Sequence, residues 1–165
     1  MGDPRRLKKK YKRPGHPFER ERMVEELEYV GKYGLRNKTE FWKSRSMLGK
    51  WRNLARQSRT LTKEKATEVQ QVLIAKLKRL GFLGPEAQFE DVLLLTVEDV
   101  LKRRLQTMVF EKGLAKSIYE ARQRIVHNHI QVGNKRINAP SYIVKKDEEK
   151  LITYAPSSPF TTSGK

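Results

Sequence analysis

Cysteine is absent from this sequence of 165 residues, which excludes disulfide bonds, thiolate catalysis and zinc sites built on cysteine. Long apolar runs are also missing, since none approaches the roughly 20 residues that a membrane-spanning helix needs, and no signal-peptide core follows the basic N-terminus. Acidic side chains are few, with 19 Asp and Glu against 36 Lys and Arg. The lack of cysteine fits an intracellular protein, and the lack of long apolar runs predicts no membrane partner.

The excess of basic residues gives a formal net charge of +17 and a pI near 10.2. Such a charge implies a polyanionic partner, because a compact chain with this charge would otherwise repel itself. Charge alone leaves a nucleic acid, an anionic membrane and an acidic protein as partners. Apolar residues make up 37% of the chain and can fill modest cores, so one large or two small domains fit the length.

Catalytic and cofactor motifs are missing as well. A nucleophile needs a base beside it, and the only histidines are His16, in a proline-rich segment, and His127 and His129. Because His127 and His129 are two positions apart, they would face different directions on a helix and could not hold one metal ion. There is no Walker A loop and no glycine-rich dinucleotide fingerprint. We therefore expect no enzyme activity, no metal and no cofactor.

Both ends of the chain have the composition of segments that do not fold alone. Residues 1–17 form a basic arm with seven Lys and Arg against a single acid, Asp3. The arm is expected to be flexible, either as a solubilising tail or as a segment that orders on RNA phosphates. Its candidate RNA contacts are Arg5, Arg6, Lys8, Lys9 and Lys10. Residues 155–165 have the composition of a linker, and we expect them to be extended or disordered in the free chain.

Residues 18–95 are predicted to form a helical domain with a connector. Apolar residues recur at helical spacing over about 19–32, 39–57 and 63–80, and Gly81 ends the third pattern. Trp42 and Trp51 could stack on bases, although large aromatic residues usually belong to a core. Four arginines share one edge of the second pattern: Arg45, Arg52, Arg56 and Arg59. This edge either follows a phosphate backbone or is a solvated face beside a core.

Residues 96–154 are predicted to form a small module of two helices and a hairpin, which gives an α+β fold. Thr96 and Ser117 each precede a carboxylate by three residues, the capping-box pattern that begins a helix. The first helix is expected to run to Gly113 with one apolar face, formed by Val97, Val100, Leu101, Leu105 and Met108.

The hairpin is predicted from the alternation of Ile130 and Val132 with polar residues, followed by Gly133 and Asn134. We expect positive φ at both of these turn residues, as in a primed turn. A further strand is expected at 142–145, and residues 151–154 could pair with it across the charged turn 146–150. The expected sheet is therefore short and mixed or antiparallel.

Basic and polar side chains crowd this module. Arg104 and Arg122 fall inside the apolar arcs of their own helices, where a charge is costly unless it is paired or reaches an anion. We predict RNA contacts by Arg104, Lys116, Ser117, Arg122, Gln123, Arg124, His127, Asn134, Lys135 and Arg136. Two alternatives stay open: Arg104 could bridge the two helices through an acid such as Glu120, and His127 could be an ordinary surface histidine.

The same residues carry a family resemblance. The RNA-binding domain named after small-subunit ribosomal protein S-four has a signature onto which the following segments fall without gaps: Arg104-Leu, Gly113-Leu-Ala, Ser117, Ala121-Arg-Gln, His127-x-His-Ile, Val132-Gly-Asn-Lys-Arg-Ile and Pro140-Ser-Tyr. The opening Met-Gly-Asp-Pro and the segments 33–38 and 77–81 resemble the archaeal and eukaryotic branch of that ribosomal family. The sequence departs from the pattern at the turn, with Gly-Asn where Asn-Gly is more usual.

The resemblance implies a structural constituent of the small ribosomal subunit, bound to the ribosome in the cytoplasm. It also implies that the two domains grip a helical junction of small-subunit ribosomal RNA, help to nucleate assembly, and lie near protein S-five and the messenger RNA entry channel. Relatives elsewhere can carry four cysteines that bind zinc or an iron–sulfur cluster, a site that this chain lacks. The residues themselves favour RNA binding by shape and phosphate contacts.

Two other classes of protein use the same module. It is appended to RNA-modifying enzymes such as pseudouridine synthases and to some tRNA synthetases, but no second domain of catalytic size remains in this chain. Non-ribosomal proteins of heat shock or stalled-ribosome rescue are usually little more than the module, whereas this chain adds a helical domain and an arm.

Overall fold

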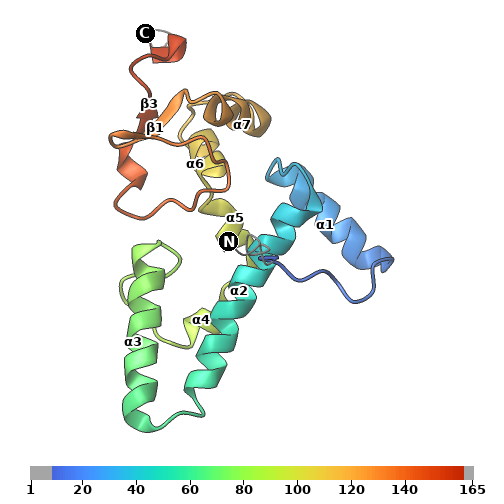
Figure 1. Ribbon diagram of the computed structural model, residues 1–165, viewed down its shortest axis with the longest axis vertical. Coiled ribbons are helices and arrows are strands. Elements are labelled where there is room, and N and C mark those ends of the chain that lie inside the picture. Colours follow the sequence, from blue (N-terminus) through green and yellow to red (C-terminus); the bar gives the residue numbers. More distant parts are fainter. Residues whose placement is uncertain (1–8, 162–165) are drawn as a thin grey trace, which may run out of the picture.

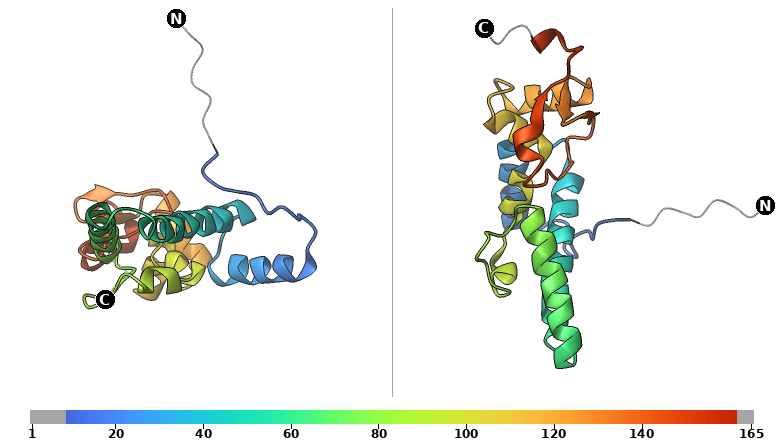
Figure 2. Two further views of the ribbon diagram at one scale, coloured as in Figure 1. Left: turned by 90° about the horizontal axis from the view of Figure 1, so that it is seen from below. Right: turned by 90° about the vertical axis from the view of Figure 1, so that its left-hand side faces the viewer.

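The computed structural model describes residues 9–161, which form an elongated molecule with a helical part at one end and an α+β module at the other (Figures 1 and 2). The helices are α1 (Arg20–Lys32), α2 (Lys38–Ser58), α3 (Lys63–Arg79), α4 (Asp91–Leu94), α5 (Val97–Lys102), α6 (Leu105–Glu111) and α7 (Ile118–Val126). The strands are β1 (Ile130–Val132), β2 (Lys135–Arg136) and β3 (Ile152–Tyr154), and two short 3-10 helices are η1 (Glu149–Leu151) and η2 (Pro159–Thr161). The expected α+β class, a helical part followed by the module, is confirmed.

The helical part is organised around α2, the longest helix. Helix α3 packs back against α2 and shares a core with it, to which α2 contributes Leu48, Trp51 and Ala55. Trp51 is buried, and its ring lies 4.9 Å from that of Phe82, so it is a core residue and not a base-stacking one. On another side, α1 packs on α2 through a small cluster of buried residues: Tyr33, Leu35, Phe41 and Leu101.

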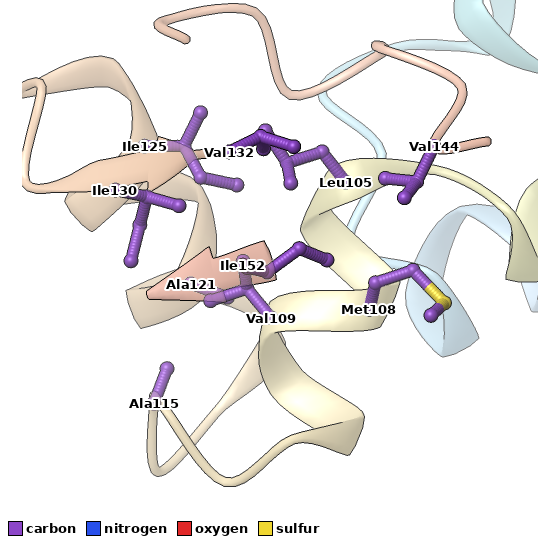
Figure 3. Close-up of a cluster of buried hydrophobic side chains, with 10 residues drawn as sticks. All are labelled: Leu105, Met108, Val109, Ala115, Ala121, Ile125, Ile130, Val132, Val144 and Ile152. Carbon is purple, nitrogen blue, oxygen red and sulfur yellow. The ribbon is translucent and has the colours of Figure 1, made fainter. Parts of the chain in front are cut away.

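The module packs α6 and α7 over a small sheet, and buried side chains of the helices and strands share one core (Figure 3). The strand order of the sheet is β2-β1-β3. Strand β1 is central because it pairs with both β2 and β3. Its Ile130 and Val132 are buried in the core, while Gln131 between them is only partly buried. The core is apolar throughout and consists of Leu105, Met108, Val109, Ala115, Ala121, Ile125, Ile130, Val132, Val144 and Ile152. Close packing of this kind tolerates few changes of volume.

The helix starts agree with the capping patterns. Thr96 and Asp99 form a complete capping box at the start of α5. The hydroxyl of Ser117 accepts a hydrogen bond from the backbone N–H of Glu120 at 3.2 Å, whereas the Glu120 carboxylate accepts from the backbone N–H of Lys116 at 2.6 Å. Ser117, predicted to contact RNA, therefore fixes the start of α7.

The prediction of a single helix from Thr96 to Gly113 is wrong, because this segment forms two helices, α5 and α6. The chain leaves the helical conformation at Arg104, which has ψ of 143° and forms an isolated bridge with Ile143. Val97, Val100 and Leu101 consequently pack with the helical part, while Leu105 and Met108 enter the module core. A single straight helix could not have served both cores. We therefore propose that the domains meet at Arg103–Arg104, and not at residues 95–96.

The sheet also differs from the expectation. Strand β3 pairs with β1, with Gln131 opposite Thr153, and not with residues 142–145, which form no named strand. In the hairpin turn only Gly133 has a positive φ, of 59°, and Asn134 does not. A type II′ turn needs positive φ only at its first central residue, so the order Gly-Asn suits it.

Residues 155–161 pack against the module, although residues 155–165 were expected to be extended or disordered in the free chain; residues 162–165 lie outside the described residues. Helix η2 places Phe160 against three side chains of the module. The Arg124 guanidinium lies 4.3 Å from the Phe160 ring centre, and the rings of His129 and Tyr154 lie 5.1 and 6.2 Å away. Contacts at these distances give the segment an anchor that its composition does not reveal.

Candidate nucleic-acid interface

The exposed members of the predicted set in the module come from α7, the loop before it and the hairpin tip. They are Lys116, Ser117, Gln123, His127, Asn134, Lys135 and Arg136. Within residues 9–161, the side chains of Lys116, Lys135 and Arg136 take part in no ion pair. Their charges are therefore available to an anion.

Arg124 is held inside the module. Its guanidinium donates to the carbonyl oxygen of Leu114, to the hydroxyl of Tyr154 and to the carboxylate of Glu120, and its side chain is only 13% exposed. With Phe160 over its face, Arg124 joins α7 to β3 and the C-terminal segment. The structure thus gives Arg124 a local packing role, where RNA contact was predicted.

Arg104 and Arg122 meet at one carboxylate, that of Glu40 in the first turn of α2. Arg104 donates to Oε2 of Glu40 and is 3% exposed, while Nη2 of Arg122 donates to Oε1 at 2.7 Å. The alternative that Arg104 pairs with an acid is confirmed, but the acid is Glu40 of the helical part and not Glu120, which pairs with Arg124 instead.

A buried glutamine extends this contact. Nε2 of Gln106 donates to the carbonyl oxygens of Gly34 and Ile118 at 2.9 and 3.0 Å, and its Oε1 accepts from Arg122 at 3.2 Å. We call Gly34, Glu40, Arg104, Gln106 and Arg122 the Glu40 junction. It joins the α1–α2 loop and α2 to α6 and α7, so it links the helical part to the module.

The electrostatics of the junction follow from its geometry. Burial raises the pKa of Glu40, but the hydrogen bonds and positive charges of Arg122 and Arg104 outweigh it, so this pKa lies below its ordinary value of 4.5. The carboxylate is therefore ionised at neutral pH. Removing it would leave the buried Arg104 without a counter-charge, which is far costlier than losing an exposed ion pair.

Most arginines on the predicted edge of α2 are exposed and have no close ion pair within residues 9–161, as a phosphate-binding surface requires. Arg45, Arg56 and Arg59 are exposed, and Arg59 has only a loose contact of 3.9 Å with Glu90. Arg52 is different, because it is half-buried and donates to the carbonyl oxygen of Leu95 at 2.5 Å. Arg52 therefore ties α2 to the segment before α5.

The described part of the arm lies along α2. The backbone N–H of Lys12 donates to the hydroxyl of Ser46 at 3.0 Å, and the rings of Tyr11 and Trp42 are 6.1 Å apart. Lys9 and Lys10 are exposed. The other predicted arm contacts, Arg5, Arg6 and Lys8, lie outside the described residues.

Between the arm and α2 lies a groove of about 760 Å³, which we call the arm–α2 groove. It is lined by residues 9–16 together with Glu19, Arg22, Trp42, Arg45, Ser46, Gly49, Lys50, Asn53 and Arg56. The predicted site set did not include Lys12, Arg13 or Lys50. The first two belong to the basic run of the arm. Lys50 is rotated by about 140° from Arg45 around α2, so a search along the arginine edge would not have found it.

Within residues 9–161, no group of three or more acidic or histidine side chains could hold a metal ion. Over the same residues, no helix is both long and apolar enough to cross a membrane.

Comparison with known proteins identifies the family. The model of the S4 domain matches residues 103–150, which begin at the break between α5 and α6. The chain is 49% identical over 160 residues to small ribosomal subunit protein uS4 of Ignicoccus hospitalis, covering 97% of this chain and 96% of the relative. The proteins of the same name from Hyperthermus butylicus and Methanothermobacter thermautotrophicus are 51% and 48% identical, covering 97% and 96% of this chain and 91% and 93% of those relatives. The chain belongs to the family of small ribosomal subunit protein uS4.

Proposed function

We propose that this chain is a structural, non-catalytic constituent of the small ribosomal subunit that binds small-subunit ribosomal RNA. The observation that carries the proposal is its likeness, over nearly the whole length, to archaeal proteins named small ribosomal subunit protein uS4. The exposed, unpaired cations of both domains support RNA as the ligand, because phosphate contacts supply most of the affinity for a folded RNA.

The contacts that we propose in the module are made by its exposed residues: Lys116, Gln123, His127, Asn134, Lys135 and Arg136. Those proposed in the helical part and the arm are Arg45, Arg56, Arg59, Lys9 and Lys10, together with Arg5, Arg6 and Lys8. Arg104, Arg122, Arg124, Arg52 and Ser117 act through the protein by holding the elements that present these contacts.

The finer proposal concerns where the chain binds. We infer that the two cationic surfaces, one on the module and one on the helical part, grip a helical junction of the ribosomal RNA and help to nucleate assembly in the cytoplasm. The family resemblance also suggests protein S-five and messenger RNA near the entry channel as neighbours. A protein whose cations lie on two linked domains is well suited to hold two RNA helices at a fixed angle.

Two measurements test the function. Gradient sedimentation of native extract should place the protein with the small subunit even at high salt, and the purified chain should bind a small-subunit ribosomal RNA fragment more tightly than an unrelated structured RNA of the same length. Recovery in the unbound fraction at high salt, or equal affinity for both RNAs, would contradict a structural ribosomal role.

A further inference from the structure

Helix α1 differs in charge from the rest of the chain. The whole sequence has 36 Lys and Arg against 19 Asp and Glu, whereas α1 (Arg20–Lys32) holds four glutamates and three cations. Two of these cations are already paired within the fold: Arg22 with Glu26 at 2.6 Å, and Lys32 with Glu98 at 2.9 Å. The local balance on α1 is therefore acidic, although the chain is strongly basic.

Three of the four glutamates lie together on the outer side of α1. At about 100° per residue, Glu21, Glu25 and Glu28 fall within about 60° of one another around the helix. All three are exposed, and none takes part in an ion pair within residues 9–161. The fourth, Glu26, is buried. Over the same residues, Arg20 is the one cation of α1 without an ion pair, so the outer side carries an excess of negative charge.

Apolar side chains border these glutamates. Val24 and Leu27 are 49% and 56% exposed and lie about one turn apart on α1. Phe18, just before the helix, is 91% exposed. A single exposed apolar residue needs no explanation, but several beside charged residues form a mixed surface of the kind that contacts another protein. The outer face of α1 therefore has both parts of a protein-binding surface.

Gly31 gives an independent sign of a close neighbour. It lies within α1, seven positions after Val24 and so on the same side, where glycine is less favourable than alanine. The fold does not require it, because its φ is not positive and a Cβ built there would meet nothing within 4 Å among the described residues. Its bare backbone lets another chain approach closely at this point.

We propose that the outer face of α1 docks a lysine- and arginine-rich segment of another protein in the same particle; the shared particle rests on the proposed function. Val24, Leu27 and Gly31 form the apolar contact, and the unpaired glutamates receive the cations of the partner. Figures 1 and 2 show α1 at the edge of the molecule, where it packs on α2. Charge complementarity selects this occupant, because the same glutamates repel the phosphates of RNA and of anionic lipids.

The first test identifies what lies on this face. Because the chain has no cysteine, Arg20→Cys carries a single benzophenone, which cross-links to protein and RNA alike. Small subunits that contain this chain are purified, and mass spectrometry identifies the cross-linked segment. We expect a lysine- and arginine-rich peptide of one other protein, and a different product or none from Val72→Cys on the exposed side of α3. Cross-links only to RNA, only to a second copy of this chain, or to no partner would overturn the proposal.

The second test removes the charges at constant shape. The α1 variant combines Glu21→Gln, Glu25→Gln and Glu28→Gln with Arg20→Cys, and its control combines Glu64→Gln, Glu68→Gln and Glu86→Gln with Arg20→Cys. The control changes the net charge equally, at exposed positions on and just after α3. We expect the yield of the protein cross-link to fall roughly tenfold in the α1 variant, because three surface charge pairs are lost. The control should keep its yield, and equal yields from the two variants would contradict the role of the glutamates.

Gly31→Leu, again with Arg20→Cys, separates docking from folding. The new side chain enters open space, so the melting temperature of the free protein should not fall. The cross-link should nevertheless be lost, because the leucine occupies the space that the partner needs. A cross-link at full yield would contradict the close approach on which the proposal depends.

Incorporation into subunits separates this inference from the proposed function. If the original chain is absent from purified small subunits, the proposed function fails. If the original chain is present while the face of α1 cross-links to RNA alone or to nothing, only the docking proposal fails.

Discussion

Arg104 is the N-cap of α6 and Arg122 lies on α7, 18 positions later, and both donate to the carboxylate of Glu40. Arg104 donates to Oε2, while Arg122 donates to Oε1 at 2.7 Å and to Oε2 at 3.3 Å. That carboxylate belongs to the helical part. The sharing means that one acid positions the N-terminal end of α6 and the middle of α7 relative to α2.

Glu40→Ala should therefore destabilise the protein by about 3–5 kcal/mol, because it leaves Arg104 buried without a counter-charge. Urea denaturation followed by circular dichroism measures the free energy of unfolding. Glu111→Ala, which removes an exposed carboxylate from the end of α6, is the matched control and should change stability little.

Arg104→Ala decides between two roles for that arginine. Because it is 3% exposed and paired, we expect a lower melting temperature of the free protein. An unchanged melting temperature with weakened RNA binding would show instead that Arg104 is an RNA contact.

The contribution of Glu40 should depend on pH. Its pKa in the folded protein is depressed, so the stability that its ionised form supplies is fully present above its ordinary value of 4.5. That stability is lost as pH falls from 4.5 through the lower folded pKa. The difference in unfolding free energy between the original chain and Glu40→Gln should be constant between about pH 5.5 and 7. It should shrink as the pH falls below 4.5. A difference that grows on acidification would contradict this sign.

Gly34→Ala tests the close approach at the junction. Gly34 has a φ of +56°, and a Cβ there would lie 2.8 Å from both Nε2 of Gln106 and Cγ2 of Ile118. We expect a loss of about 1–3 kcal/mol. Gly31→Ala, three positions earlier within α1, meets nothing within 4 Å and should instead stabilise by about 0.5–1 kcal/mol. Thermal melts of the two variants give the comparison.

The hairpin tip should contribute electrostatic affinity. Replacing Lys135 and Arg136 together with Gln should lower the slope of log affinity against log salt by about 1.4–1.8, if each cation neutralises one phosphate. Lys65→Gln with Lys76→Gln removes the same charge from exposed positions on α3. A similar slope change in both double variants would mean that the hairpin is not a specific contact.

Local signals predicted much of this fold. The caps at Thr96 and Ser117 and the stops at Gly81 and Gly113 depend on hydrogen bonds within a few residues, and the helices begin and end where those residues stand. The sequence resemblance around residues 104–142 likewise identified the family, and the S4 domain model matches 103–150.

Tertiary contacts account for the parts that could not be predicted. The break at Arg104 arises because Leu101 and Leu105 enter different cores, and the periodicity of apolar residues does not say which core each one meets. Glu40 lies 64 positions from Arg104 and 82 from Arg122, so no local pattern could pair them. Arg104 and Arg122, predicted to contact RNA, both pair with this distant carboxylate. Arg124 pairs with Glu120 four positions earlier on α7, a spacing that a local pattern could have indicated.

With the domain boundary that we propose, the break between α5 and α6 leaves two residues, Arg103 and Arg104, to connect the two domains, and both are bonded in place. The carbonyl of Arg103 accepts from the N–H of Val144 at 3.0 Å, and its guanidinium pairs with Glu149 at 2.9 Å. A connector so short and so fully bonded holds the surfaces of the two domains at one spacing. An RNA that engages the first surface therefore meets the second at a high effective concentration when its own geometry matches, and at almost none when it does not. If both proposed surfaces bind RNA, selectivity among RNA folds would follow from the rigidity of this two-residue link, without any reading of base sequence.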